Sequence, residues 1–161
     1  MGSENADMDA KIVEFLRLDG TLTNATISER LGVSEATIRR RRQRLEDEGY
    51  IRIIASANPI KLGYKIVAII GVQAIKSKVL IVEAQLRPLP QIHFLGLTTG
   101  HYDLMLEAWL RSNDEVVQFT TEALGRIDGI MRTDIFQFLR LTKYYGWSGD
   151  LHEAGNGAEA T

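Results

Sequence analysis

The sequence of 161 residues contains no cysteine, only three prolines and no long apolar run. Without cysteine, the chain has no disulfide, no thiolate metal site and no cysteine nucleophile. No segment approaches the roughly 20 apolar residues needed to cross a bilayer, so we expect no membrane partner. The N-terminal stretch "MGSENADMDAKI" lacks the basic start and the apolar segment of a secretory signal, which favours a cytoplasmic protein.

Motifs for cofactors, metals and nucleophilic catalysis are also missing. There is no G-x-S-x-G, no P-loop and no G-x-G-x-x-G. The three histidines, His93, His101 and His152, are far apart, and none has a second histidine at metal-ligand spacing. His93 falls inside an expected strand and is interpreted as structural. We therefore expect no metal, no cofactor and no enzymatic activity.

Positive charge is scarce overall but is concentrated at one place. The formal net charge is -2, and residues 1–9 and 150–161 each carry three acids and no lysine or arginine. In contrast, the stretch "RRRRQR" at 39–44 holds five arginines. Because binding to a polyanion responds to local clusters, the acidic total does not exclude a nucleic-acid partner. The simpler alternative is a solvated basic helix whose charge is balanced by the acids of "LEDEG".

Apolar periodicity and capping residues predict three helices in the first 52 residues. The turn between the second and third helices is very short and contains a glycine, which is typical of a helix-turn-helix. In that motif the second helix lies in the major groove of DNA, with its N-terminal half at the bases. The expected cap and stop of each helix are Asp7 or Asp9 with Gly20, Thr23 with Gly32, and Ser34 with Gly49.

The arginines lie on the third of these helices, which is expected from Glu35 to Glu48. At 100° per residue, Ile38 and Leu45 point inward, and the arginine-rich side faces outward. Arginines on the flanks can bind phosphates, while Arg or Gln on the exposed face can read bases. The residues expected to contact double-stranded DNA are Ser34, Ala36, Thr37, Arg39, Arg40, Gln43 and Arg44.

Arg42 does not fit this division, because it falls close to Ile38 on the side that should pack. A buried guanidinium without a partner would cost several kcal/mol. We therefore expect Arg42 either to extend to water or to pair with an acid such as Glu14 or Asp47.

The rest of the chain predicts an α+β domain. Residues 50–64, "YIRIIASANPIKLGY", indicate a strand or short hairpin followed by a linker. Residues 65–145 then follow the order β-α-β-β-α-β of the ferredoxin-like fold. Its expected segments are a strand at 65–73, a helix from Ser77 to Pro88, strands at 92–98 and 102–110, a helix capped by Ser112 or Asn113, and a long strand at 129–145. The predicted organisation is a helix-turn-helix (winged-helix-like) domain at 1–52, a strand and linker at 53–64, the α+β domain at 65–145 and a disordered tail at 146–161.

Three stretches together resemble the Lrp/AsnC (leucine-responsive and asparagine-responsive, or feast/famine) family of transcriptional regulators. They are "DGTLTNATISERLGVSEATIRRRRQRLEDEGYI", "ANPIKLGYKIVAIIGVQ" and "TGHYDLMLEAW", and the resemblance spans residues 9–145. It implies a sequence-specific DNA-binding regulator whose C-terminal domain pairs through its sheets into a homodimer, and often an octamer. Arg42 is a departure, since the family usually has an aliphatic residue there.

The resemblance also implies a small effector, commonly an amino acid, near a "G-x-x-D" turn that corresponds here to Gly100–Asp103. A carboxylate at the start of a strand can hold an ammonium group, while turn N–H groups and hydroxyls can hold a carboxylate. The alternative is that Gly100 makes a tight hairpin that Asp103 caps. The residues expected to bind an effector are Thr98, Thr99, Gly100, Tyr102, Asp103 and Thr133.

Two other classes of protein are compatible with this fold. One is an enzyme similar to siroheme decarboxylase, in which the helix-turn-helix no longer reads DNA. The other is a stand-alone amino-acid-binding module. The arginine cluster favours the regulator over both, because neither alternative uses it.

Overall fold

The chain forms two compact units, with the boundary between Ser56 and Ala57. The computed structural model describes residues 2–145, 147–148 and 151. Residues 57–64, expected to be part of a linker, belong with the second unit, where Asn58 and Pro59 are buried. Among the described residues, no helix is long and apolar enough to cross a membrane.

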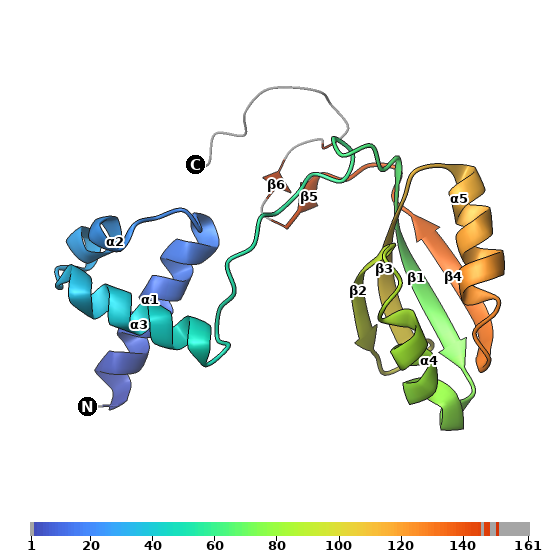
Figure 1. Ribbon diagram of the computed structural model, residues 1–161, viewed down its shortest axis with the longest axis horizontal. Helices are drawn as coiled ribbons and strands as arrows, with labels where there is room; N and C mark the ends of the chain where they lie inside the picture. The colour runs from blue at the N-terminus through green and yellow to red at the C-terminus, as the bar shows by residue number, and fades with distance from the viewer. Residues whose placement is uncertain (1, 146, 149–150, 152–161) are drawn as a thin grey trace. The chain divides into compact units, whose positions relative to one another are not determined.

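The first unit contains three helices, α1 (Gly2–Leu18), α2 (Asn24–Leu31) and α3 (Glu35–Asp47) (Figure 1). Their buried core is small and aliphatic. Five side chains from all three helices form it: Ile12, Leu16, Ile27, Ile38 and Leu45. The inward positions expected for Ile38 and Leu45 are confirmed.

The start of α1 differs from the prediction. Asp7 and Asp9 lie inside the helix and cap nothing, because no glycine or proline interrupts residues 3–9. Acidic residues are also favourable near a helix N-terminus, so the early acids prolong α1 instead of beginning it. Asp7 pairs with Lys11 one turn later, at 2.7 Å.

The turn between α2 and α3 has the predicted caps. The hydroxyl of Thr23 accepts a hydrogen bond from Thr26 N, and that of Ser34 accepts one from Thr37 N. Gly32 ends α2 in the left-handed region, with φ at 66°, where a side chain would be strained. Only Gly32, Val33 and Ser34 separate the two helices, so the position of α3 relative to α2 is fixed locally.

The strand or hairpin expected in 50–64 is absent, although this segment is described throughout. Residues 51–58 have no regular structure, and 59–63 form a turn. Asn58 organises that turn, because its Oδ1 accepts hydrogen bonds from Ile60 N at 2.9 Å and Lys61 N at 3.3 Å. The β-branched residues Ile51, Ile53 and Ile54 favour extended backbone, but a strand also needs a second strand beside it.

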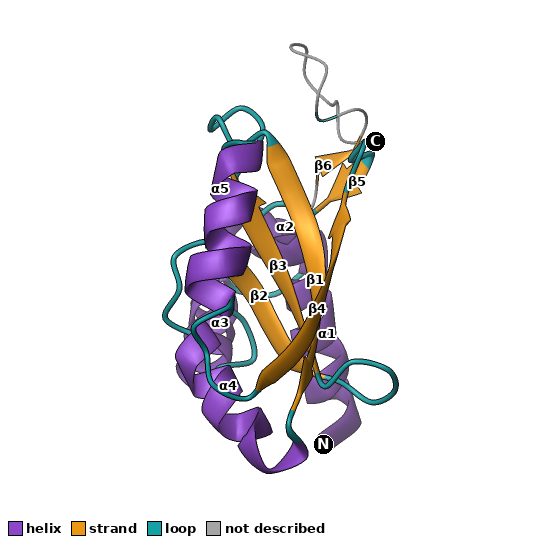
Figure 2. Ribbon diagram, turned by 90° about the vertical axis from the view of Figure 1, so that its right-hand side faces the viewer, coloured by secondary structure: helices purple, strands orange, loops and turns teal. Residues whose placement is uncertain are grey.

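The second unit contains a four-stranded antiparallel sheet in the order β2-β3-β1-β4. Its helices α4 and α5 lie on one face of that sheet (Figure 2). The elements are β1 (Ile66–Ala74), the 3-10 turn η1 (Lys76–Lys78), α4 (Val79–Leu86), β2 (Ile92–Leu97), β3 (Leu104–Leu110), α5 (Asn113–Gln118), the π-helical turn η2 (Phe119–Leu124) and β4 (Ile130–Gln137). The predicted order β-α-β-β-α-β is confirmed.

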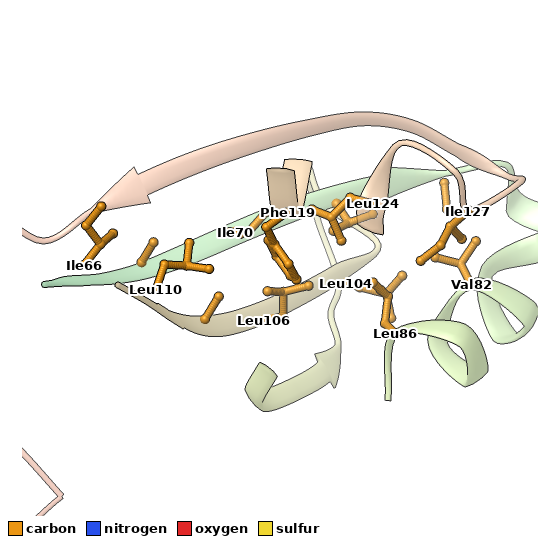
Figure 3. Packing of buried hydrophobic residues seen from close by; sticks show 14 residues of the cluster. Ile66, Ile70, Val82, Leu86, Leu104, Leu106, Leu110, Phe119, Leu124 and Ile127 are labelled. Atoms are coloured by element: carbon orange, nitrogen blue, oxygen red, sulfur yellow. The ribbon is translucent and has the colours of Figure 1, made fainter. Parts of the chain in front are cut away.

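Alternation along the two central strands builds the main core. Even-numbered residues of β1 and β3, such as Ile70 and Leu106, point toward the helices and are fully buried. They pack against Val82 of α4 and Phe119 at the end of α5 (Figure 3). Odd-numbered residues therefore point to the other face, which we call the open face of the sheet.

The end of the second unit folds back over part of the open face. The long strand expected at 129–145 stops at Gln137, and β5 (Lys143–Tyr144) then pairs with β6 (Trp147–Ser148). Tyr144 and Trp109 both donate to the buried carboxylate of Glu107, which holds this hairpin down. Burial and the Glu107 carboxylate raise the pKa of Tyr144. The disorder expected for 146–161 is wrong for β6, and residues 146, 149–150 and 152–161 lie outside the described part.

Candidate nucleic-acid interface and effector site

The outward side of α3 forms a shallow groove of mixed charge. Ile38 and Leu45 anchor the opposite side of the helix in the core, at 0% and 4% exposure. The residues on the outward side of α3 therefore do not contribute to the buried core. The groove is lined by Ala36, Arg39, Arg40, Gln43, Arg44, Asp47 and Glu48. Five of the seven residues predicted to contact DNA thus share one surface.

The five arginines divide into two groups. Arg39 and Arg40 are exposed, and neither has a carboxylate within 4.0 Å among the described side chains. The other three each have an acidic partner. Arg41 and Arg44 both contact Asp9 of α1, and Arg42 contacts Glu46.

Arg42 pairs with neither of the acids expected for it. Its Nε donates to Glu46 Oε1 at 3.0 Å, one turn along the same helix. Its Nη1 donates to the carbonyl oxygen of Leu22 at 3.2 Å, in the loop between α1 and α2. Glu46 is reachable because residues four apart lie on the same side of a helix, whereas Asp47 lies on the exposed side. Arg42 therefore fastens α3 to the preceding loop.

Ser34 and Thr37 lie at the N-terminus of α3, and Gln43 lies near its middle. The Ser34 and Thr37 hydroxyls are 2.8 Å apart and form a hydrogen bond. Gln43 Nε2 donates to Asp47 Oδ1 at 2.8 Å. These are exposed, solvent-facing contacts that a ligand can exchange at little cost, since they are made in water.

The turn expected to hold an effector joins β2 to β3 at one end of the sheet. Gly100 has a φ of 108°, which a residue with a side chain rarely adopts. Thr98 closes the turn twice: its N–H donates to Asp103 O at 3.0 Å, and its hydroxyl donates to Tyr102 O at 2.7 Å. Thr99 is exposed and lies at the tip.

Asp103 is already engaged within the chain. Its Oδ2 accepts a hydrogen bond from Ala74 N at 2.9 Å, and its Oδ1 contacts the ammonium of Lys76. The N–H of Ala74 and the charge of Lys76 lower the pKa of this carboxyl. Its side chain is 11% exposed, whereas that of Lys76 is 83% exposed. Lys76 is therefore the loose member of the pair.

Tyr102 lies across β1 on the open face. An added Cβ at Gly71 would be 2.6 Å from the Tyr102 ring, so only glycine allows this approach. The Tyr102 hydroxyl donates to Asp134 Oδ2 at 3.1 Å, and Arg132 donates to the other oxygen, Asp134 Oδ1. Burial, followed by the bond to Asp134, raises the pKa of Tyr102. Arg132, followed by Tyr102, lowers that of Asp134.

Register separates Thr133 from the ring of Tyr102. Thr133 pairs with Val72, whose side chain is in the helix-covered core, whereas Asp134 pairs with Gly71 on the open face. The five turn residues of the predicted set thus lie together, and Thr133 points to the opposite face. Sequence reasoning missed Lys76, Arg132 and Asp134, since their proximity depends on strand register that periodicity alone does not reveal.

Comparison with known proteins matches both units. Residues 6–52 fit a family model described as a winged helix-turn-helix DNA-binding domain, and residues 67–148 fit the Lrp/AsnC ligand binding domain. An uncharacterized HTH-type transcriptional regulator of Pyrococcus abyssi is 37% identical over 88% of this chain and 90% of its own. The regulator LrpA of Pyrococcus horikoshii is 31% identical over 78% and 90%.

Solved structures agree with this relationship. E. coli AsnC superposes with a TM-score of 0.76, at 27% identity over 86% of this chain and 94% of its own. A Neisseria meningitidis transcriptional regulator in complex with L-Met superposes with a TM-score of 0.76, at 28% identity over 85% and 91%. With a helix-turn-helix of the right geometry followed by this α+β domain, the chain belongs to the Lrp/AsnC family of DNA-binding transcriptional regulators.

Proposed function

We propose that α3 enters the major groove of its operator and that Arg39 and Arg40 bind the DNA there. The observation that carries this proposal is a pair of exposed guanidinium groups on the side of α3 opposite its buried residues; neither has an acidic partner in the part of the chain that the structure describes. Ala36 and Gln43 share that surface and are suited to base contacts. Ser34 and Thr37, at the helix N-terminus, are suited to phosphate contacts.

The test is the salt dependence of binding to duplex DNA. Each phosphate contact contributes about 0.9 to the slope of log K against log salt concentration. Arg39→Gln and Arg40→Gln should each reduce the slope by about that amount, because each removes one phosphate contact. Arg126→Gln is the matched control, because Arg126 is an exposed arginine of the second unit whose partner, Glu122, lies on its own helical turn. Equal slopes for all three variants would refute the proposed interface.

We infer that the regulator acts in the cytoplasm as a homodimer or a larger assembly, such as an octamer, with two copies of α3 facing two half-sites of one operator. The membership in the family supports this, together with exposed aromatic side chains on the open face. Phe94 is 49% and Phe136 is 52% exposed, which is unfavourable for an isolated chain. Sedimentation equilibrium of the wild type and of Phe136→Asp measures this directly. A monomeric wild type would contradict it.

We also propose that the 98–103 turn takes an amino acid as effector. The L-Met complex of the Neisseria relative supports a ligand of this chemistry. In this chain, an incoming ammonium group would replace that of Lys76 beside Asp103. The ammonium of Lys76 is exposed to water, so another ammonium group can replace it at little cost. The Thr98 hydroxyl is already donating, which leaves Thr99 and the turn N–H groups for the ligand carboxylate.

L-methionine is the first probe for this site, followed by the other amino acids, with calorimetry as the measurement. Asp103→Asn should abolish binding, and Lys76→Met should strengthen it by removing the competing ammonium. Lys65→Met is the control, because Lys65 is exposed and lies outside the turn. Binding that is indifferent to both Asp103→Asn and Lys76→Met would locate the ligand elsewhere. If no amino acid binds the wild type, the effector proposal fails and the DNA proposal is unaffected.

A further inference from the structure

One carboxylate of α1 holds two of the five arginines of α3. Arg41 Nη1 donates to Asp9 Oδ1 at 2.9 Å, and Arg44 Nη2 contacts Asp9 Oδ2. The side chains of Asp9 and Arg41 are only 17% and 12% exposed, while that of Arg44 is 45% exposed. Arg41 is therefore committed to the interior of the unit, and Arg44 lies at its edge.

Arg44 is at the border of two surfaces. It lines the outward groove of α3, together with Arg40 and Gln43. It also lines a second depression, between α1 and the end of α3, together with Asp9 and Arg17. A long, flexible arginine at this position can point either toward DNA or toward α1. The ion pair with Asp9 selects α1.

We propose that Asp9 is a positioning residue that withholds Arg44 from DNA, so that phosphate contacts of α3 come from Arg39 and Arg40. This inference rests on the DNA interface proposed above. Moving Arg44 to a phosphate would leave Asp9, which is largely buried, with Arg41 alone, and would exchange one ionic contact for another. The net gain is small, because an ion pair lost offsets the ion pair formed.

The consequence is that Asp9 limits the non-specific affinity of the protein for DNA, which does not depend on the DNA sequence. Phosphate contacts supply nearly all of the non-specific affinity of a DNA-binding protein, whereas base contacts supply its specificity. By occupying Arg44, Asp9 lowers the first without touching Ala36 or Gln43. The arginine cluster therefore presents fewer positive charges to DNA than its sequence indicates.

The test compares Asp9→Asn with Asp7→Asn on a duplex of random sequence between 50 and 200 mM salt. Both variants remove one negative charge from α1, but among the described residues Asp7 pairs only with the exposed Lys11 of the same helix. Asp9→Asn should release Arg44 and steepen the salt slope by about 0.9, which makes the loss of affinity over this range about 3.5-fold larger. Asp7→Asn should leave the slope at the wild-type value. The double variant Asp9→Asn with Arg44→Gln should also return to the wild-type slope.

A second comparison leaves Asp9 intact, in case its loss unfolds the unit. Arg44→Gln alone should keep the wild-type slope, whereas Arg40→Gln should reduce it by about 0.9. A reduction by Arg44→Gln equal to that by Arg40→Gln would overturn the inference, as would identical slopes for Asp9→Asn and Asp7→Asn in folded protein. A wild type that binds without salt dependence would instead refute the DNA interface itself.

Discussion

The close approach of Tyr102 to Gly71 predicts that Gly71→Ala destabilises the wild type but stabilises a variant that lacks the Tyr102 ring. In Gly71→Ala the new Cβ would lie 2.6–2.7 Å from three carbons of the Tyr102 ring. Carbon atoms in contact are normally separated by about 3.5–4.0 Å, so the ring must move by roughly 1 Å. That movement also strains the bond from the Tyr102 hydroxyl to Asp134, which is already 3.1 Å long.

The magnitude follows from these two effects. Overpacking a buried site typically costs about 1–3 kcal/mol. Loss of one hydrogen bond adds about 0.5–1.5 kcal/mol. We therefore expect Gly71→Ala to lower the free energy of unfolding by about 2–4 kcal/mol. In a Tyr102→Ala background the space is empty, and alanine is favoured over glycine within a strand by about 0.5–1 kcal/mol. There, the same substitution should be stabilising.

The assay is urea unfolding of the wild type, both single variants and the double variant, at one fixed chain concentration. The interaction energy from this cycle isolates the contact between residues 71 and 102. If Gly71→Ala destabilises the chain equally in both backgrounds, the ring does not lie over Gly71, and the steric reasoning is wrong.

Three further predictions concern other contacts. Ser34→Ala removes the N-cap of α3 and should lower the free energy of unfolding by about 1 kcal/mol in thermal melts, whereas the outward Ala36→Ser should change it little. Glu46→Ala should be more destabilising than Arg42→Leu in the same melts, because it leaves the half-buried Arg42 guanidinium without its carboxylate, whereas leucine removes that charge altogether. The reverse order would contradict the pairing of Arg42 with Glu46. Because the pKa of Asp103 is lowered, its contribution to stability is complete above the ordinary value of 3.8 and is lost as the pH falls through the folded value. Urea titrations at several pH values should therefore show that the free energy of unfolding of the wild type exceeds that of Asp103→Asn at neutral pH and that this difference shrinks in acid. A difference that does not change with pH would contradict this role of Asp103.

Local signals explain what the sequence predicts well. Thr23, Gly32 and Ser34 determine the bounds of α2 and α3 through hydrogen bonds within a few residues, so the helix-turn-helix is readable from residue types and spacing. The order of elements in the second unit can likewise be read from the spacing of apolar residues, which changes between the helical and the strand pattern along the chain.

Contacts that are distant in sequence explain what was missed. Asp9 reaches Arg41 and Arg44 across more than 30 positions, and nothing local indicates which acid pairs with which arginine. The placement of Thr133 on the helix-covered face depends on the register between β1 and β4. A change of one position would turn it to the other face. Similarly, the fold-back of β5 depends on the hydrogen bond from Tyr144 to Glu107. Periodicity places Glu107 in a strand, but it does not reveal that Tyr144 is its partner.

The short connection from Gly32 to Ser34 has a consequence for how regulators of this kind diversify. Local caps and two apolar side chains, Ile38 and Leu45, hold α3 in place, whereas positions 36, 39, 40 and 43 are exposed and lie outside the core. With the DNA interface proposed above, mutations there would change operator preference without first being compensated elsewhere. A lineage can therefore acquire new target genes by substitutions at a handful of surface codons while the scaffold stays the same.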